Sequence, residues 1–221
     1  MTASTVDGPD VLDVRGHRPH WSLARTWLLQ PGTAEDPSTF DRAVASPADV
    51  VVLDIEDGVP DARKPAARAA VADWLSRGGR AWVRVSPAGS QEWSSDLTAL
   101  AGSPGLAGVM LAKTECAADV DATAAALPEK IPVVALVESA VGVEAAVEIA
   151  GAARCGRLAF GTGDFRRDTG MSGDSMALAY PRGRLVVASR VAGCPTPSTG
   201  RPCAPRPGIW RVRPRSPGRW G

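Results

Sequence analysis

Ionisable residues stand at or near the end of five consecutive short apolar runs in this sequence. They are Asp54, Glu56 and Asp57 after VVVL, Arg84 within WVRV, Lys113 after VMLA, Glu138 after VVALV, and Asp164 after FGTG. One charged residue at a strand end usually lies in solvent or caps the next helix. Five such ends in succession instead indicate a shared polar site, provided that the fold brings them together.

Glu138 and Asp164 are the candidate metal ligands in this set. A hard divalent cation such as Mg²⁺ prefers a few carboxylate oxygens, with water and substrate oxygens completing the octahedron. Zinc or iron would favour histidine or cysteine, and no histidine stands at these ends. The pattern therefore indicates Mg²⁺, with Mn²⁺ as the alternative.

Arg84 and Lys113 are the candidate substrate-binding side chains. The planar guanidinium of Arg84 matches a carboxylate in a bidentate way, so we expect an anionic substrate. Glu56 and Asp57 are the candidate catalytic residues. Asp54 and Glu56 share one face of an extended strand, so both can face inward while Asp57 begins the loop.

Gly161, Thr162 and Gly163 form the loop before Asp164. Glycines let backbone amides approach a ligand, so this segment is a candidate binding loop for a carboxylate or carbonyl oxygen. A tight turn is the simpler interpretation. A GxGxxG dinucleotide motif would need a third glycine where Arg166 stands, so NAD is not supported.

Strands and helices must alternate to position these residues. The apolar runs predict strands at 27–29, 50–55, 81–85, 108–112, 132–137 and 157–161. Three-to-four spacing of apolar residues predicts helices at 37–46, 62–77, 93–101, 116–127 and 141–150. The strands are continuous in apolar character, as in parallel sheets covered on both faces. This periodicity fits an open doubly wound sheet or a barrel equally well.

Composition excludes several classes of protein. The 221 residues suit one domain, and the net charge of +1 gives no reason to expect nucleic acid or an anionic membrane as partner. No apolar run reaches the length of a membrane span, so a cytoplasmic location is expected. The four cysteines lack CxxC spacing, which argues against structural zinc, and a chain of this size does not need a disulfide framework.

Several motifs occur together in one order. They are WLLQPG at 27–32, VVLDIEDGV at 51–59, WVRV at 82–85, VMLAKTE at 109–115, ALVESAVGV at 135–143, FGTGDFRRDTG at 160–170 and LVVASRVAG at 185–193. In order and spacing this set resembles the citrate lyase beta subunit and malyl-CoA or citramalyl-CoA lyases of the HpcH/HpaI aldolase superfamily. The resemblance covers about residues 26–193.

The resemblance implies an α/β fold, a (β/α)8 TIM barrel of the phosphoenolpyruvate/pyruvate type, here incomplete with about six βα units. It implies Mg²⁺ at Glu138 and Asp164, a substrate carboxylate at Arg84, and a homotrimer. The implied reaction cleaves a 3-hydroxyacyl-CoA such as malyl-, citramalyl- or citryl-CoA into a 2-oxo acid and acetyl-CoA. Some relatives hydrolyse the thioester instead. Related enzymes also take a catalytic acid from the C-terminal region of an adjacent subunit, and no residue here matches it.

Residues 1–25 are expected to be a loose leader, 26–193 a partial barrel, and 194–221 a disordered tail. The tail holds seven prolines, six arginines and no acidic residue, a composition that does not form a barrel strand and helix. Strand six would then have an unpaired edge, and the first strand would lack its closing neighbour. We hypothesise a frame shift near Cys194 in a GC-rich gene; resequencing that finds an intact frame would count against it.

Two alternatives to the lyase remain. A free 2-oxo-acid aldolase of the same superfamily would need no thioester, but such enzymes generally use a histidine base after an early strand, and no histidine follows His20. An inactive truncated product is the other alternative.

Overall fold

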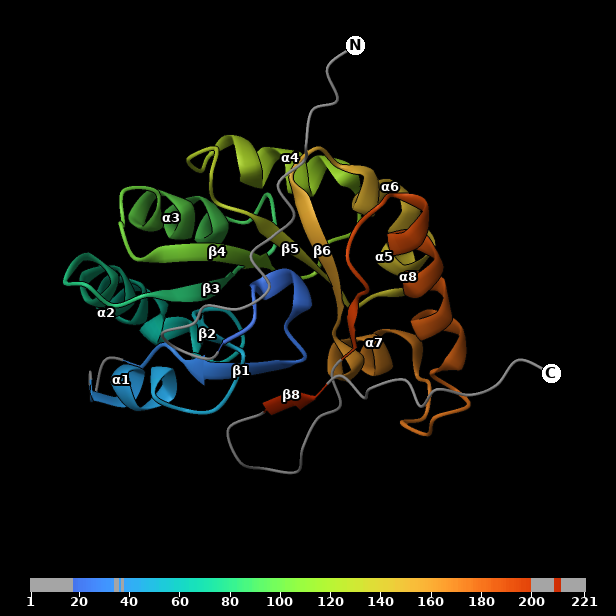
Figure 1. Cartoon of the computed structure of the whole chain (residues 1–221), viewed down its shortest axis with the longest axis horizontal. Helices are drawn as coiled ribbons and strands as arrows, with labels where there is room; N and C mark the ends of the chain where they lie inside the picture. The colour runs from blue at the N-terminus through green and yellow to red at the C-terminus, as the bar shows by residue number, and fades with distance from the viewer. Residues whose placement is uncertain (1–17, 34–35, 37, 200–208, 212–221) are drawn as a thin grey trace, which may run out of the picture.

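Six parallel strands form a sheet that curls into an incomplete barrel (Figure 1). The computed structural model describes residues 18–33, 36, 38–199 and 209–211. The parallel strands are β1 (Thr26–Pro31), β2 (Val50–Asp54), β3 (Ala81–Val85), β4 (Leu106–Leu111), β5 (Val133–Val137) and β6 (Cys155–Phe160). All six predicted strands are confirmed, and consecutive strands are neighbours throughout.

Helices cover the outer face of this sheet (Figure 1). They are α1 (Ser38–Val44), α2 (Lys64–Ser76), α3 (Gln91–Leu100), α4 (Ala117–Ala125), α5 (Ala140–Glu144), α6 (Ala146–Gly151), α7 (Thr162–Thr169) and α8 (Ala179–Val191), with short 3-10 turns η1 (Trp21–Leu23) and η2 (Asp61–Arg63). The predicted helices are confirmed, except that 141–150 is two short helices. Helices α7 and α8 were not predicted, and the GTG segment is the first turn of α7 rather than an isolated turn.

Side chains on the strands separate into two apolar layers because successive residues point to opposite faces. In β2, Val51 and Leu53 pack in the larger layer under the helices. Val52 faces the other way, into a smaller layer at the barrel centre together with Trp82 and Leu136. The alternation places the next inward positions at the carboxyl ends of the strands, where polar side chains replace the apolar ones.

Aromatic rings fill the amino-terminal end of the barrel. Trp82 lies 5.4 Å between ring centroids from both Trp21 and Trp27. Arg157 is buried below them and donates to the carbonyl oxygens of Trp21 (3.1 Å) and Ala24 (2.9 Å). The expectation of a loose leader therefore does not describe residues 18–25, which pack against the barrel; residues 1–17 lie outside the described part of the chain.

Both edges of the parallel sheet carry a further short strand. Strand β7 (Ser198–Thr199) pairs parallel with β6, and strand β8 (Ile209–Arg211) pairs antiparallel with β1. The expectation that these two edges lack neighbours was wrong. Two or three residues suffice to pair an edge strand, and the prolines at 195 and 197 precede the paired residues of β7. The remaining tail, 200–208 and 212–221, lies outside the described residues.

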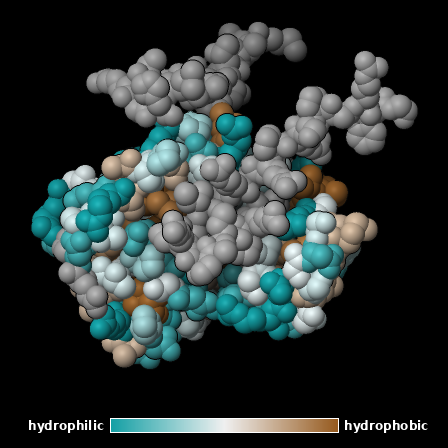
Figure 2. Space-filling view, turned by 90° about the horizontal axis from the view of Figure 1, so that it is seen from below, coloured by the Kyte–Doolittle hydropathy of each residue, from teal (hydrophilic) through white to brown (hydrophobic). Residues whose placement is uncertain are grey.

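The described surface carries scattered apolar side chains. Figure 2 shows small separate hydrophobic areas on one face where the described residues are visible. No helix within the described ranges is both long and apolar enough to cross a bilayer.

Gly105 tests the packing of α2 against the sheet. A Cβ at Gly105 would lie 1.8 Å from the carbonyl oxygen of Gly79 and 2.7 Å from that of Leu75, and backbone atoms there cannot move aside cheaply. We expect Gly105→Ala to lower the free energy of unfolding by at least about 2 kcal/mol in urea titrations. The matched Gly102→Ala, with no atom within 4 Å of its new Cβ, should change stability by less than about 0.5 kcal/mol. Equal effects would contradict this packing.

Candidate active site

The carboxyl ends of β2, β3 and β5 bring three ionisable side chains to one mouth of the barrel. Asp54, Arg84 and Glu138 are each at most 9% exposed and stand at inward positions. Asp54 and Arg84 are direct register partners on neighbouring strands. On each of these strands the inward-facing side chains are apolar up to the last inward position, where a charged side chain follows.

Arg84 is the buried cation at the centre of this group. Its Nε and Nη2 donate to Asp54 at 2.8 and 2.5 Å, a bidentate pair, and its Nη1 lies 3.1 Å from Glu56. Attraction to Asp54 outweighs the effect of burial and raises the pKa of Arg84. Asp54 and Glu56 therefore both face inward, and Arg84 is held by the chain's own carboxylates while it lines the cavity.

Lys113 connects the remaining acidic side chains. Its Nζ lies 2.6 Å from Glu56, 3.2 Å from Asp57 and 3.7 Å from Asp164. Its backbone amide donates to Glu138 at 3.0 Å. Lys113 also has a φ of +49°, a left-handed conformation that side chains rarely adopt and that persists only where the surroundings enforce it. The strained backbone aims the amide and the ammonium at different carboxylates.

Glu138 is a buried carboxyl group without a basic side chain beside it. It is 4% exposed, and within the described residues no side-chain nitrogen of Lys, Arg or His lies within 4.0 Å of its oxygens. Burial raises the pKa of Glu138 to about 8, and the negative charges of Asp164 and Glu56 act in the same direction. The Lys113 amide and the more distant charge of Arg84 only partly oppose this rise.

The pKa values of the neighbouring groups shift in different directions. Burial raises the pKa of Glu56, although Arg84 and Lys113 act against it. For Asp57 burial also acts upward, but the Lys113 ammonium outweighs it and the pKa is lowered. Burial disfavours the charge of Lys113, yet its hydrogen bond and attraction to Glu56 raise its pKa. Two adjacent carboxyls thus differ in proton affinity, which suits acid and base roles.

Helix α7 contributes the other side of the site. Asp164 lies in its first turn and pairs with Arg167 at 2.9 Å. The helix begins directly after Gly161, where a Cβ would lie 2.1 Å from Glu138 Oε2, so only glycine lets β6 approach that carboxylate. Gly163 has no atom within 4 Å of an added Cβ, and Thr162 is buried with its hydroxyl unpaired among the described residues.

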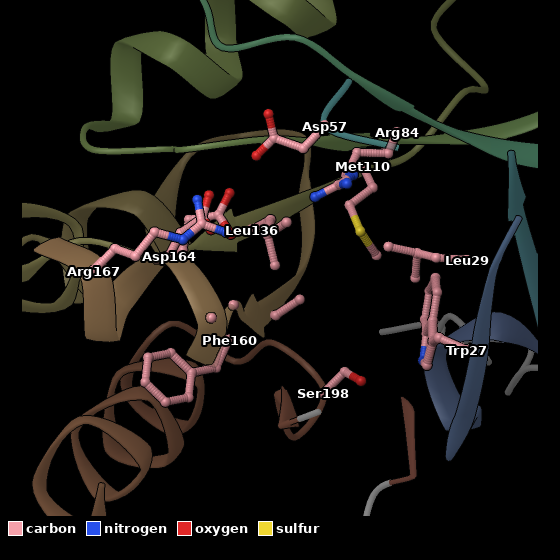
Figure 3. Close-up of a pocket in the computed structure, with 14 residues that line it drawn as sticks. Trp27, Leu29, Asp57, Arg84, Met110, Leu136, Phe160, Asp164, Arg167 and Ser198 are labelled. Atoms are coloured by element: carbon pink, nitrogen blue, oxygen red, sulfur yellow. The ribbon is translucent and has the colours of Figure 1, made fainter. Parts of the chain in front are cut away.

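A cavity of about 200 Å³ lies between these elements. Figure 3 shows Asp57 and Arg84 on one side of it and Asp164 and Arg167 on the other, with apolar side chains below. Glu138, Gly161 and Gly163 also line it, together with Trp27, Leu29, Met110, Leu136, Ala159, Phe160 and Ser198. The cavity has a charged mouth and an apolar floor.

The donor set fits a divalent cation. Five carboxyl groups, at 54, 56, 57, 138 and 164, face three basic side chains, at 84, 113 and 167, so this group carries a net charge of −2 when all are ionised. Within the described residues Glu138 has no basic side chain within 4.0 Å, and Asp164 pairs with the exposed Arg167 and, at 3.7 Å, with Lys113. No three acidic, histidine or cysteine side chains in the described ranges are grouped to hold a metal alone. Mg²⁺ at this pair would take its other ligands from water and substrate.

Every site residue predicted from the sequence lies in or beside this group, and Arg167 was missed. Arg167 stands three residues after Asp164, a spacing that brings two side chains together only on a helix. No helix was predicted at 162–169, so this ion pair was not expected. The backbone role of Lys113 was also missed, because nothing in the residue type announces a left-handed conformation.

Comparisons of sequence and fold relate this chain to known proteins. Residues 28–198 match the sequence profile of the HpcH/HpaI aldolase/citrate lyase family. A citrate lyase subunit beta-like protein of Mycobacterium tuberculosis is 45% identical over 126 residues, which cover 57% of this chain and 43% of that protein. An L-malyl-CoA/beta-methylmalyl-CoA lyase of Rhodobacter capsulatus is 32% identical over 168 residues, covering 68% and 52%.

One solved structure shares the fold over most of the chain. It is CitE of Mycobacterium tuberculosis in complex with magnesium, acetoacetate and coenzyme A, with a TM-score of 0.66 and 35% identity. The match covers 78% of this chain and 64% of CitE. The chain spans about half the length of the curated relatives described above.

The raised pKa of Glu138 predicts a pH dependence of stability without metal. Because the folded state keeps this proton up to about pH 8 while the unfolded carboxyl releases it near 4.5, the folded state binds more protons in that window. Stability should therefore fall as pH rises from 4.5 to 8, by about 1–3 kcal/mol. Glu138→Gln should remove this loss, measured by urea unfolding in EDTA.

The exposed Glu148→Gln on α6 is the matched control and should keep the wild-type slope. A Glu138→Gln variant that loses stability with pH as steeply as the wild type would contradict the assignment of the slope to Glu138.

Proposed function

The chain belongs to the HpcH/HpaI aldolase/citrate lyase family, and from this we propose that it is a magnesium-dependent carbon–carbon lyase. Its proposed substrate is a 3-hydroxyacyl-CoA such as malyl-, citramalyl- or citryl-CoA, and its products are a 2-oxo acid and acetyl-CoA. The observation that carries the proposal is the buried Glu138, which has no basic side chain within 4.0 Å among the described residues and lines the same cavity as Asp164. A pair of this kind at a barrel mouth favours a hard cation.

Mg²⁺ held by Glu138 and Asp164 would polarise a substrate oxygen as a Lewis acid. Glu138 carries a proton near neutral pH in the absence of metal, so binding of the cation must displace that proton. Because Gly161 has no Cβ, the backbone that follows β6 packs close to Glu138 without a side chain in contact with Oε2, and Glu138 lines the cavity.

Substrate carboxylate binding falls to Arg84 and the first turn of α7. Asp54 and Glu56 hold the guanidinium plane in place, and each Nη keeps a second N–H for a ligand. The first amides of α7, those of Thr162, Gly163 and Asp164, have no partners within the helix, and the helix dipole favours an anion there. Together these donors suit the single carboxylate that a malyl or citramalyl thioester carries on its hydroxyacyl group.

Proton transfer falls to Glu56 and Asp57. In the cleavage direction the bond between the hydroxyl-bearing carbon and its neighbour breaks, the hydroxyl loses its proton, and the acetyl fragment gains one. Glu56, with its raised pKa, is the better proton donor of the two, and Asp57, with its lowered pKa, is the more readily ionised base. Lys113 joins both carboxylates and orients them.

A free 2-oxo-acid aldolase is less well supported. Among the described residues no histidine lines the cavity: His20 lies beside Trp21 at the opposite end of the strands, and His17 is outside the described part of the chain. The further proposal of a homotrimer rests on the family resemblance, and light scattering of the purified chain tests it.

The assay of this proposal uses the full chain with malyl-CoA and citramalyl-CoA. We expect release of a 2-oxo acid that requires Mg²⁺ and stops with EDTA. Release of free CoA thiol without a 2-oxo acid would instead identify thioester hydrolysis. Glu138→Gln should lower the rate by at least about 100-fold, because it removes a charge from the metal site.

Two glycine variants form a matched pair, one at the site and one away from it. Gly161→Ala would place a methyl group 2.1 Å from Glu138 Oε2 and should reduce both the rate and the upward shift of the melting temperature with Mg²⁺. Gly151→Ala, on α6 with no atom within 4 Å, should leave both unchanged. Activity that persists in EDTA, or a Glu138→Gln variant with the wild-type rate, would overturn the proposal.

A further inference from the structure

Two cysteines far apart in the sequence meet behind the barrel. Cys155 begins β6 and is 8% exposed, and Cys194 follows the end of α8. The sulfur of Cys194 lies 3.4 Å from the carbonyl oxygen of Cys155 and 3.2 Å from that of Ala150. Cys194 therefore lies directly against the backbone of Cys155, and the two residues are close neighbours rather than isolated cysteines.

Backbone contacts on both sides hold Cys194 in this position. Gly193 ends α8 in a left-handed conformation, φ +74°, and the amide of Cys194 donates to Ser189 at 2.9 Å. Two residues later, the carbonyl of Thr196 accepts from the buried Arg157 Nε at 2.7 Å. The chain therefore returns to the start of β6 at a fixed place, which holds Cys194 beside Cys155.

The pair is chemically unequal. The neighbouring Cys155 side chain lowers the pKa of Cys194 to about 7, against the effect of burial. The Cys194 side chain, together with burial, raises the pKa of Cys155. Cys194 is partly exposed, so it is both the more accessible thiol and the one that ionises near neutral pH, which are the properties of an attacking cysteine.

We propose that Cys155 and Cys194 form a reversible disulfide by exchange with a small disulfide of the glutathione class. The Cys194 thiolate attacks one sulfur of the small disulfide, forms a mixed disulfide and releases one small thiolate. Cys155 then loses its proton and attacks the sulfur of Cys194, forming the protein disulfide and releasing the second small thiol. Two protein thiols are oxidised and one small disulfide is reduced to two thiols.

The cross-link would tie β6 directly to the segment that leads to β7. Ser198 and Phe160 belong to these two strands and line the cavity, and the backbones of both residues take part in the β6–β7 pairing. A disulfide at Cys155 and Cys194 therefore fixes one wall of the cavity. It also closes a long loop of the chain, which restricts the unfolded state.

The test uses the full chain with Cys116→Ser and Cys203→Ser, which leaves only the proposed pair. Cys116 is exposed at the start of α4, and Cys203 lies outside the described residues. Treatment with oxidised glutathione should lower the thiol count from two to zero, with a mass loss of two hydrogens and a peptide map that joins 155 to 194. The melting temperature of the oxidised protein should rise and return on reduction.

Two single variants in that background give the order of attack. Cys155→Ser should stop at the mixed disulfide, with one glutathione attached to Cys194. Cys194→Ser should react at least tenfold more slowly, because the buried Cys155 is the poorer nucleophile. A stable glutathione adduct without cross-linking in the parent, a link only between two chains, or faster reaction in Cys194→Ser would each overturn the proposal.

Discussion

Arg84 is a charge buried in the barrel mouth, and most of the site geometry is what its burial requires. A guanidinium removed from water needs opposite charges and hydrogen-bond acceptors at close range, or its desolvation is not offset. Asp54 supplies a bidentate partner on the adjacent strand and Glu56 a second one. The strand register that pairs positions 54 and 84 is thus both a fold constraint and an electrostatic one.

The distribution of partners around this cation leaves one carboxylate open. Asp54 is satisfied by Arg84, and Glu56 and Asp57 share Lys113. Lys113 reaches Glu138 only with its backbone amide, which carries no full charge. Burial then keeps Glu138 protonated near neutral pH, a state that a bound cation would reverse. The left-handed backbone at Lys113 is what makes this unequal sharing possible.

Much of this arrangement could be predicted from the sequence because it follows from period and chain direction. Continuous apolar runs predicted the six strands, and parallel strands place residues such as 84 and 138 at one mouth whatever their separation along the chain. The pairing of Arg84 with Asp54 could not be predicted, because it depends on the strand register. Helix α7 was missed because TGDFRRDT has almost no apolar side chains, and its stability comes from Phe165 packing on Phe160.

Polarity divides the barrel along its axis, and the division separates stability from chemistry. At the amino-terminal end three tryptophans fill the space. The backbone of Gly108 packs against the ring of Trp82, and that of Gly156 packs against the ring of Trp21. Arg157 is also buried there, but carbonyl oxygens rather than carboxylates satisfy it, and burial lowers its pKa to about 10. A buried arginine facing carbonyls ties segments of the chain together, whereas one facing carboxylates organises ionisable groups. Buried arginine therefore stabilises packing at the amino-terminal end of the barrel and organises a cluster of ionisable groups at the carboxyl-terminal end.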